Sequence, residues 1–349
     1  MNQDQEVLTL LSRAFWIALG SAALFAMPVY RTLLSLKSRQ IVSEFVPEHA
    51  KKQGTPTMGG LIIVIGFLIA CGCLQLTEMV SGPLLPAAML LCAGFAFIGF
   101  LDDFIVPRLI EGKRGLGWKQ KLLLELLITG ATVYWLRHGH GDFKIGAFVA
   151  VFVILFFSNA YNFVDGMDGL AGTILVLLAG GLVALGFIEM RQDVLMVLCI
   201  ALIGAVIPFL VLNAPPAKVF MGDVGSLPIG AVLGLVVNEM MRPGVQKLPS
   251  SMGGALSVMP AHPLTTVLQN SLPLVVISFV MIAELVPVPL QIASVKLRKK
   301  RIFPKTPIHH AFESAGWPES RVVWLFCLVQ FFAVAVALSI AIANPVIPR

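Results

Sequence analysis

The sequence predicts an all-α polytopic membrane protein with about ten transmembrane helices. Of its 349 residues, 57% are hydrophobic and 13% are charged, whereas about 25% are charged in an average soluble domain. The apolar residues form long continuous runs, while the strands of a membrane β-barrel alternate between apolar and polar residues. The five cysteines all lie in apolar runs, and their odd number argues against a disulfide framework.

Ten apolar segments are candidate spans, because a helix needs about 20 mostly apolar residues to cross a bilayer. They are expected near residues 14–36, 57–76, 84–101, 119–137, 145–160, 169–189, 193–213, 227–240, 263–283 and 321–343. The first six residues are polar and acidic, unlike a signal peptide, so we expect the first segment to be retained. Residues 1–349 are expected to form a single integral-membrane domain.

Lysine and arginine predict the orientation, because cytoplasmic loops are enriched in these residues. Most of the 25 lysines and arginines fall in loops on one side of the predicted spans, which we therefore assign to the cytoplasm. Both termini are then extracytoplasmic, and we expect a multi-pass protein of the bacterial inner (cytoplasmic) membrane with a cytoplasmic-face active site. The net charge of +6 follows from this bias and from attraction to anionic membrane lipid. No nucleic acid is expected as a partner, because no basic stripe with interleaved aromatic residues lies outside the membrane loops.

Five aspartates close or follow apolar runs on the predicted cytoplasmic side. They are Asp102, Asp103, Asp165, Asp168 and Asp223. A carboxylate near the bilayer is energetically expensive and is a functional hypothesis by default. Two acidic residues at a helix C-terminus are disfavoured by the helix dipole, so the adjacent pair calls for a cation, although it could also simply mark the membrane boundary. The set predicts an anion-rich pocket for a divalent cation and a phosphate-bearing substrate.

Two further motifs place polar groups beside these aspartates. Asn159, Asn162, Asp165 and Asp168 recur every third residue, which predicts one polar stripe along a helix; polar contacts between helices are the alternative. The segment 220–226 (FMGDVGS) has glycines for a tight turn, which would expose Asp223 as an oxygen ligand and let Ser226 cap the next helix.

The second expected span opens with an anion-binding pattern or an ordinary capped helix. Thr55 suits an N-cap and Pro56 suits the first helical position. Free amides at that helix start, beside Lys51 and Lys52, would attract an anion.

Near the C-terminus, a basic run at 296–301 precedes His309 and His310, and paired histidines can bind phosphate, shuttle protons or ligate metal. Without a nearby cysteine, a structural zinc site is not expected.

Two prolines at 287 and 289 should break the ninth helix. Broken helices at membrane depth line cavities, so Glu284 and Gln291 are expected to face the site.

Taken together, these motifs resemble the polyprenyl-phosphate N-acetylhexosamine-1-phosphate transferase superfamily, and most closely its peptidoglycan branch, the phospho-N-acetylmuramoyl-pentapeptide transferases. The matching motifs occur in the family's order. They are KQGTPTMGG at 52–60, GFLDD at 99–103, NAYNFVDGMDGLA at 159–171, FMGDVGS at 220–226, the segment from Glu284 to Gln291, RIFPKTPIHH at 301–310 and GWPE at 316–319.

The resemblance implies ten helices and Mg²⁺-dependent transfer of phospho-MurNAc-pentapeptide from UDP-MurNAc-pentapeptide to undecaprenyl phosphate, which gives lipid I and UMP. It also implies a homodimer. Asp223 would bind Mg²⁺ at the diphosphate, and Asp102 and Asp103 would serve the metal or the lipid phosphate. The other implied substrate contacts are Lys52 at the phosphates, Thr57 at an unassigned part of the substrate, Asn159, Asn162, Asp165 and Asp168 at the nucleotide or sugar, Phe220 and Gln291 at the uracil, and His309 and His310, also with a catalytic role, near the phosphates.

Three departures from the family pattern keep alternatives open. Val106 stands where the family has a lysine, although Arg108 is close; Ala311 replaces a third histidine; and residues 241–262 look like a longer extracytoplasmic loop. A sister transferase that passes a simpler N-acetylhexosamine-1-phosphate is the first alternative, and an inactive relative that binds nucleotide-sugar or lipid is the second. A transporter is disfavoured, because its substrate groups would lie near the bilayer midplane.

Overall fold

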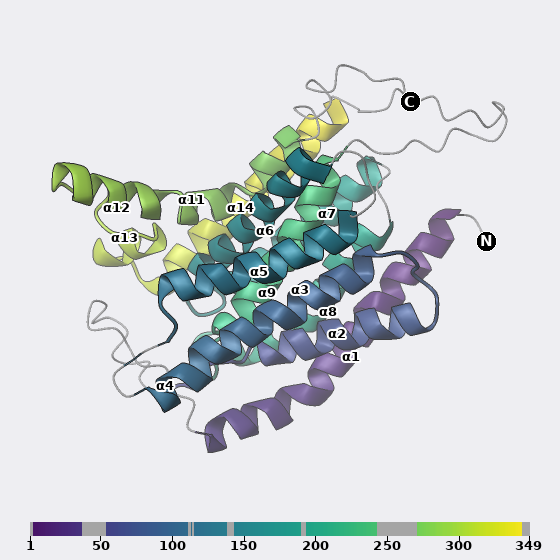
Figure 1. The fold of residues 1–349 in the computed structure, drawn as a ribbon, viewed down its shortest axis with the longest axis horizontal. Helices are drawn as coiled ribbons and strands as arrows, with labels where there is room; N and C mark the ends of the chain where they lie inside the picture. Colours follow the sequence, from purple (N-terminus) through teal and green to yellow (C-terminus); the bar gives the residue numbers. More distant parts are fainter. Residues whose placement is uncertain are drawn as a thin grey trace.

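The computed structural model describes residues 3–36, 54–110, 113, 115–137, 143–189, 193–242 and 271–343, and the regular elements in these ranges are helices (Figure 1). The elements are α1 Gln3–Ser35, α2 Leu61–Leu76, α3 Leu84–Phe100, a π-helical turn Leu101–Ile105, α4 Val106–Leu109, α5 Trp118–Arg137, α6 Phe143–Val164, α7 Leu170–Ile188, α8 Asp193–Asn213, α9 Asp223–Met241, α11 Phe279–Leu285, α12 Pro287–Arg298, α13 His309–Ser314 and α14 Glu319–Ala343.

In the described part of the chain, eight helices are long and apolar enough to cross a membrane, which confirms a polytopic membrane protein. The predicted limits need revision at several of them. Helix α1 begins at Gln3 rather than near residue 14, and α9 begins at Asp223 rather than at 227. A candidate span at Phe279–Arg298 extends well past residue 283, where the ninth segment was expected to end. The exact span count and the side of each terminus stay predictions. Residues 263–270 of the ninth predicted span, and 243–262 of the predicted loop, lie outside the described residues.

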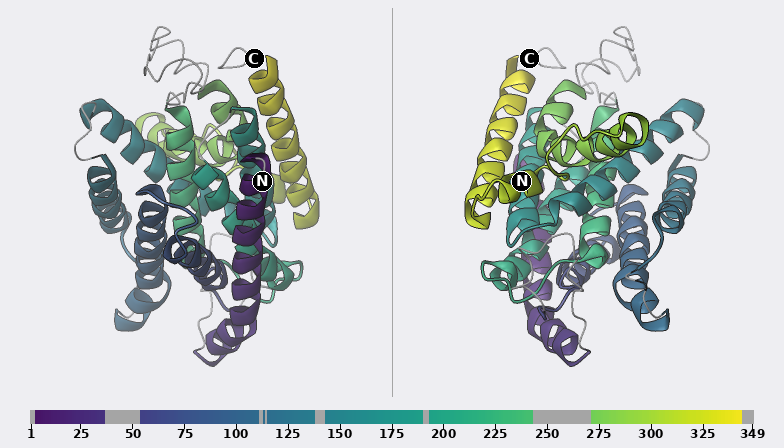
Figure 2. Two further views of the ribbon diagram at one scale, coloured as in Figure 1. Left: turned by 90° about the vertical axis from the view of Figure 1, so that its right-hand side faces the viewer. Right: turned by 90° about the vertical axis from the view of Figure 1, so that its left-hand side faces the viewer.

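Helix α9 lies inside the bundle, where it packs against α6 and α3 (Figure 1). Within its apolar window, 94% of the residues are buried. Helices α1 and α14 lie at the margins of the bundle (Figure 2). Helices in lipid associate largely through close packing, which small residues permit. A Cβ on Gly230 of α9 would lie 2.4 Å from the carbonyl oxygen of Phe157, so the backbones of α9 and α6 are nearly in contact.

The third helix does not end at the paired aspartates, as the sequence analysis expected. It continues through the π-helical turn Leu101–Ile105 into α4, which ends at Leu109. Asp102 and Asp103 therefore lie inside a helix with a wide turn, and the argument from a helix C-terminus was wrong about their position. Single π-helical turns occur frequently at functional sites, because the extra residue redirects neighbouring side chains.

The predicted break at the two prolines is confirmed as an interruption of helical hydrogen bonding between α11 and α12. Val286 lies between them and keeps right-handed helical torsions, with φ −61° and ψ −38°. Proline has no N–H to donate, so the hydrogen-bond ladder cannot pass through Pro287 and Pro289. Helix α12 extends away from the bundle at the end where α13 also lies (Figure 1). All five cysteines are free, as expected.

The contact between α9 and α6 leads to a stability prediction. Gly230→Ala should destabilise the protein by about 1–3 kcal/mol, because the new Cβ would overlap the backbone of α6 at Phe157. The measurement is the thermal unfolding midpoint in detergent.

Gly180→Ala in α7 is the matched control, because a Cβ there meets nothing within 4 Å. Its expected effect is neutral or slightly stabilising, since glycine inside a helix is disfavoured relative to alanine by about 0.5–1 kcal/mol. Equal midpoints for the two variants would contradict the close packing of α9 on α6.

Candidate functional site

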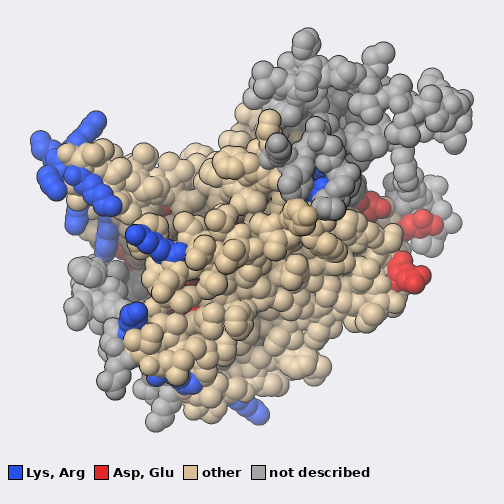
Figure 3. Space-filling model, in the orientation of Figure 1, with Lys and Arg blue, Asp and Glu red and all other residues tan. Residues whose placement is uncertain are grey.

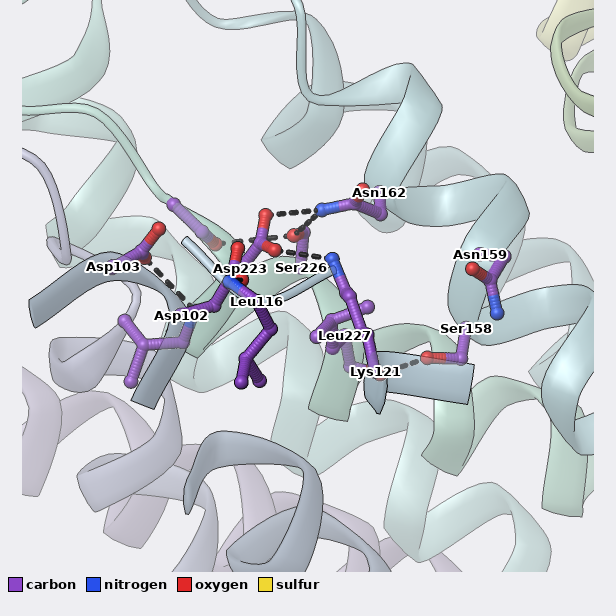
Figure 4. A network of polar contacts seen from close by, with 12 residues as sticks. Asp102, Asp103, Leu116, Lys121, Ser158, Asn159, Asn162, Asp223, Ser226 and Leu227 are labelled. Carbon is purple, nitrogen blue, oxygen red and sulfur yellow. Dashed lines mark hydrogen bonds and ion pairs between the residues drawn. The ribbon is translucent and has the colours of Figure 1, made fainter. Parts of the chain in front are cut away.

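Three carboxylates from two segments far apart in the sequence lie close together (Figure 4). Asp102 and Asp103 come from the π-helical turn, and Asp223 is the first residue of α9. One oxygen of each carboxylate lies within 4.8 Å of the others, and all three residues are half-buried. Carboxylate oxygens are the ligands that Mg²⁺ prefers, so this set could hold a divalent cation.

The N-terminus of α9 lowers the electrostatic cost of this arrangement. The main-chain N–H of Val224 donates to Oδ2 of Asp103 over 3.3 Å, and Asp223 itself stands in the first turn of the helix. Unpaired N–H groups give a helix N-terminus a partial positive charge that stabilises nearby anions. Two of the three carboxylates therefore sit where the backbone favours negative charge.

A lysine and an asparagine complete the cluster. The ammonium of Lys121 in α5 forms an ion pair and hydrogen bond with Oδ2 of Asp223. Nδ2 of Asn162 lies 2.7 Å from Oδ1 of Asp223 and 2.8 Å from Oγ of Ser226. Figure 4 shows both nitrogen groups directed at Asp223. One ammonium leaves three nearby carboxylates with an excess of negative charge, which suits an additional cation.

Glycines allow the backbone segments to come together. A Cβ on Gly99 would lie 2.3 Å from the carbonyl carbon of Asp223, and one on Gly222 would lie 2.5 Å from Oδ2 of Asp103 and 2.6 Å from Oγ1 of Thr57. Gly222 also has a φ of +71°, a conformation that costs other residues steric strain. These positions therefore hold Asp103, Asp223 and Thr57 close together.

Thr57 reaches this cluster through an extended segment rather than through a helix start. Helix α2 begins at Leu61, with Gly60 as its N-cap, so the prediction that Thr55 and Pro56 begin it is wrong. Instead, the N–H of Phe220 donates to the carbonyl of Pro56 at 2.9 Å, and the N–H of Gly59 donates to the carbonyl of Phe220 at 2.8 Å.

This pairing places Thr57 and Phe220 on neighbouring extended segments beside the carboxylates. Lys51 and Lys52 lie outside the described residues. Ser226 does not cap α9; its hydroxyl donates to the carbonyl of Gly222 from within the first turn, at 3.1 Å.

The predicted four-residue polar stripe is not continuous, because α6 ends at Val164. Asn162 reaches the carboxylate cluster, whereas the amide of Asn159 donates to Oε2 of Glu125 in α5, at 2.8 Å. Asp165 lies in the turn after α6. Burial and the negative charge of Asp223 raise the pKa of Asp165 to about 7, while a hydrogen bond from the backbone of Gly222 acts in the opposite direction.

Asp168 holds loops together rather than joining the cluster. Its Oδ2 accepts from the N–H of Ala217 at 3.0 Å, and its own N–H donates to Oε1 of Glu319 at 2.8 Å. Next to it, the N–H of Gly169 donates to Oδ1 of Asn213 at 2.9 Å. The contact of Asp168 with substrate stays a prediction.

The side chain of Gln291 also forms hydrogen bonds within the protein. Its Oε1 accepts from the N–H groups of Ile302 and Phe303 at 2.9 and 3.0 Å, and its Nε2 donates to the carbonyl of Phe303 at 2.9 Å. The side chain thus fixes the loop that follows α12, and its proposed contact with uracil stays a prediction.

The two histidines lie side by side at the start of α13, with ring centroids 4.2 Å apart. A carboxylate faces Nδ1 of each ring. Oε2 of Glu284 lies 3.0 Å from Nδ1 of His309, and Oε2 of Glu313 lies 2.6 Å from Nδ1 of His310. The expectation that Glu284 faces an open site needs correction, since its side chain is fully buried against His309.

The cation that accompanies the aspartates is not the one suggested by the sequence. Arg108 stacks on the ring of Phe104, 3.7 Å from its centroid, and donates to the carbonyl of Leu36. Lys121 contacts Asp223 instead. The signal that could have identified it is the four-residue spacing of Lys121, Glu125 and Thr129 in a leucine-rich segment, which predicts one polar face on α5.

Comparisons with known proteins agree with these motifs. A family model described as glycosyl transferase family 4 matches residues 85–240, and a phospho-N-acetylmuramoyl-pentapeptide-transferase signature matches residues 52–64. Three relatives carry the name phospho-N-acetylmuramoyl-pentapeptide-transferase. The protein from Bacillus cytotoxicus is 33% identical over 97% of this chain and 99% of its own length, that from Clostridium perfringens 34% over 86% and 90%, and that from Staphylococcus epidermidis 35% over 89% and 93%.

The matched regions include the segment that carries Thr57 and the helices that carry the three clustered aspartates, Lys121 and Asn162. With identity above 30% sustained over nearly the whole chain, this protein belongs to the phospho-N-acetylmuramoyl-pentapeptide-transferase family.

Proposed function

We propose that this protein transfers phospho-MurNAc-pentapeptide from UDP-MurNAc-pentapeptide to undecaprenyl phosphate, with lipid I and UMP as products. The observation that carries the proposal is the meeting of Asp102, Asp103 and Asp223 with Lys121 at one end of an apolar helix bundle, in a chain of this family. This position suits a reaction between a lipid phosphate at the membrane and a nucleotide-sugar from the aqueous phase.

The reaction needs alignment more than covalent help from the protein. An oxygen of the lipid phosphate forms a bond to the phosphorus that carries the sugar, and the bond from that phosphorus to UMP breaks, so UMP leaves with the electron pair. The nucleophile is already anionic at neutral pH. Catalysis of phosphoryl transfer therefore consists mainly of positioning and charge neutralisation.

We propose Mg²⁺ as the cofactor, held by Asp223, Asp102 and Asp103. Their oxygens lie within 4.8 Å of one another and are hard anionic ligands of the kind that Mg²⁺ prefers. When bound, Mg²⁺ would supply positive charge to the diphosphate of the donor.

The protein's own groups keep the cluster in order. Lys121 and Asn162 each contact a different oxygen of Asp223, so this carboxylate has a fixed orientation. The ammonium also offsets part of the negative charge that would otherwise repel a diphosphate. We propose that Asn159, Asp165, Asp168, Thr57 and Phe220 contact the donor's nucleotide or sugar, that Lys52 neutralises phosphate charge, and that His309 and His310 act near the phosphates.

We propose that the site faces the cytoplasm, in the inner membrane of a bacterium. Basic side chains gather at the end of the molecule where α4 and α12 lie (Figure 3), and exposed members include Arg108, Lys296 and Arg298. Loops rich in lysine and arginine stay on the cytoplasmic side of a membrane. The family resemblance also leads us to propose a homodimer.

The first experiment measures UMP release by the purified protein with undecaprenyl phosphate and either UDP-MurNAc-pentapeptide or UDP-GlcNAc, with and without Mg²⁺. We expect release only with the pentapeptide donor and only with Mg²⁺. Release from UDP-GlcNAc would assign the protein to the sister transferases. Nucleotide binding without release from either donor would support the inactive relative.

Asp223→Asn should lower the rate of UMP release by about 100-fold or more, because it removes the charge of a proposed metal ligand while keeping its shape. Asp193→Asn, in the first turn of α8 and exposed, is the control for loss of one carboxylate and should keep the wild-type rate. The unfolding midpoints of both variants should match the wild type within a few degrees. Full activity of Asp223→Asn would refute the assignment of the site.

Lys121→Met should lower the rate by about 10–100-fold, since a charge-assisted hydrogen bond contributes about 1.5–3 kcal/mol and about 1.4 kcal/mol corresponds to a factor of ten. Lys119→Met is the matched control, because Lys119 is exposed on the same turn of α5 and contacts the ring of Trp118 instead. If the two variants were equally active, the ion pair with Asp223 would have no part in turnover.

A further inference from the structure

Both oxygens of one buried carboxylate contact the same histidine. Glu284 in α11 is 0% exposed and His309 in α13 is 1% exposed. Oε1 of Glu284 accepts from the main-chain N–H of His309 at 3.1 Å, and Oε2 lies 3.0 Å from ring atom Nδ1. Both oxygens of a buried acid thus face two nitrogens of the same residue.

This double contact fixes the imidazole. An ionised carboxylate only accepts hydrogen bonds, so Nδ1 carries its proton toward Oε2. A ring flip would break that bond and leave Oε2 of the buried carboxylate without its partner, which is unfavourable. His309 therefore has one orientation and one tautomer while Glu284 is in place.

The other ring nitrogen points at the turn that carries Asp165. Nε2 of His309 is buried and has no hydrogen-bond partner among the residues that the structure describes. A Cβ on Gly166 would lie 2.3 Å from Nε2, and its three nearest atoms all belong to the His309 ring. The backbone of Gly166 therefore lies directly against the Nε2 edge of the ring, and position 166 has no side chain between them. Asp165 precedes it and receives a hydrogen bond from Gly222, the neighbour of Asp223.

We propose that Glu284 is a positioning residue, which holds His309 with Nδ1 protonated so that Nε2 keeps its lone pair and accepts a hydrogen bond from a hydroxyl of the nucleotide-sugar substrate at the Asp165–Asp168 turn. This inference rests on the proposed function. Buried polar atoms in folded proteins almost always have partners, and one without a partner calls for an explanation. A substrate hydroxyl that enters beside Gly166 would donate the hydrogen bond that Nε2 lacks among the described residues.

The test uses ¹⁵N-histidine NMR of the full-length protein in nanodiscs, with the His309 signals identified by their loss in His309→Asn. We expect the wild type to show protonated Nδ1 and a Nε2 signal that shifts when UDP-MurNAc-pentapeptide is added. In Glu284→Gln, the amide supplies only one acceptor, so we expect Nδ1 to accept from the amide and the proton to move to Nε2. The kcat/KM for UMP release should fall about tenfold or more.

Glu6→Gln is the control for loss of a glutamate charge, because Glu6 is exposed in α1, and it should keep wild-type spectra and rates. Protonated Nε2 in the wild type, a Nε2 signal that ignores the donor, or wild-type kcat/KM in Glu284→Gln would each overturn the proposal. The tautomer is measured without turnover, so failure of the proposed function, seen as no UMP release by the wild type, is distinguishable from failure of this inference.

Gly166→Ala keeps the proposal testable if Glu284→Gln does not fold. The new Cβ would displace the ring while Glu284 stays intact, so we expect the donor-induced shift of Nε2 to disappear and kcat/KM to fall about tenfold. In a His309→Ala background, the same substitution should cause no further loss. An additive loss in the double variant would show that Gly166 acts independently of His309, and would overturn the proposal.

Discussion

Repulsion among three carboxylates at one end of the bundle is the constraint that organises this structure. Asp102, Asp103 and Asp223 could not approach within 4.8 Å in an apolar environment without compensation. The chain supplies it from three directions: the N-terminus of α9, the ammonium of Lys121 and the amide of Asn162. Helices α5, α6 and α9 must therefore converge at this end, and the packing of the bundle and the chemistry of the site are parts of one arrangement.

Close backbone contact links that convergence to the rest of the fold. Gly99 brings the third helix against the start of α9, and Gly60 lets the start of α2 approach Gly225, to which an added Cβ would be 2.2 Å away. Small residues allow helices in lipid to approach in this way, because van der Waals packing replaces the hydrophobic driving force available in water. The sequence alone does not mark these glycines as important, because their role depends on which segment packs against them in the fold.

The sequence was most informative where local composition decides the structure. Apolar runs predicted the membrane helices, and aspartates at their ends predicted a carboxylate cluster that includes Asp102, Asp103 and Asp223. It was misleading where hydrogen bonding between distant segments decides. The segment before α2 is extended because it pairs with Phe220, and the third helix continues past Asp103 through a π-helical turn. Lys121 lies near the start of a predicted span, and only the packing of α5 against α3 and α6 brings its side chain to Asp223.

Two departures from the family pattern, Val106 and Ala311, supported the hypothesis that this protein is an inactive relative, and the structure weakens that hypothesis. Val106 does not deprive the carboxylates of a cation, because Lys121 contacts Asp223 from another helix. Ala311 follows a pair of histidines whose Nδ1 atoms both face a glutamate. Burial of Glu284 against His309 is weak support for stability, since buried polar and charged pairs are often replaceable by apolar residues. The retention of such a pair beside the turn of Asp165 fits a site that still acts on its substrate.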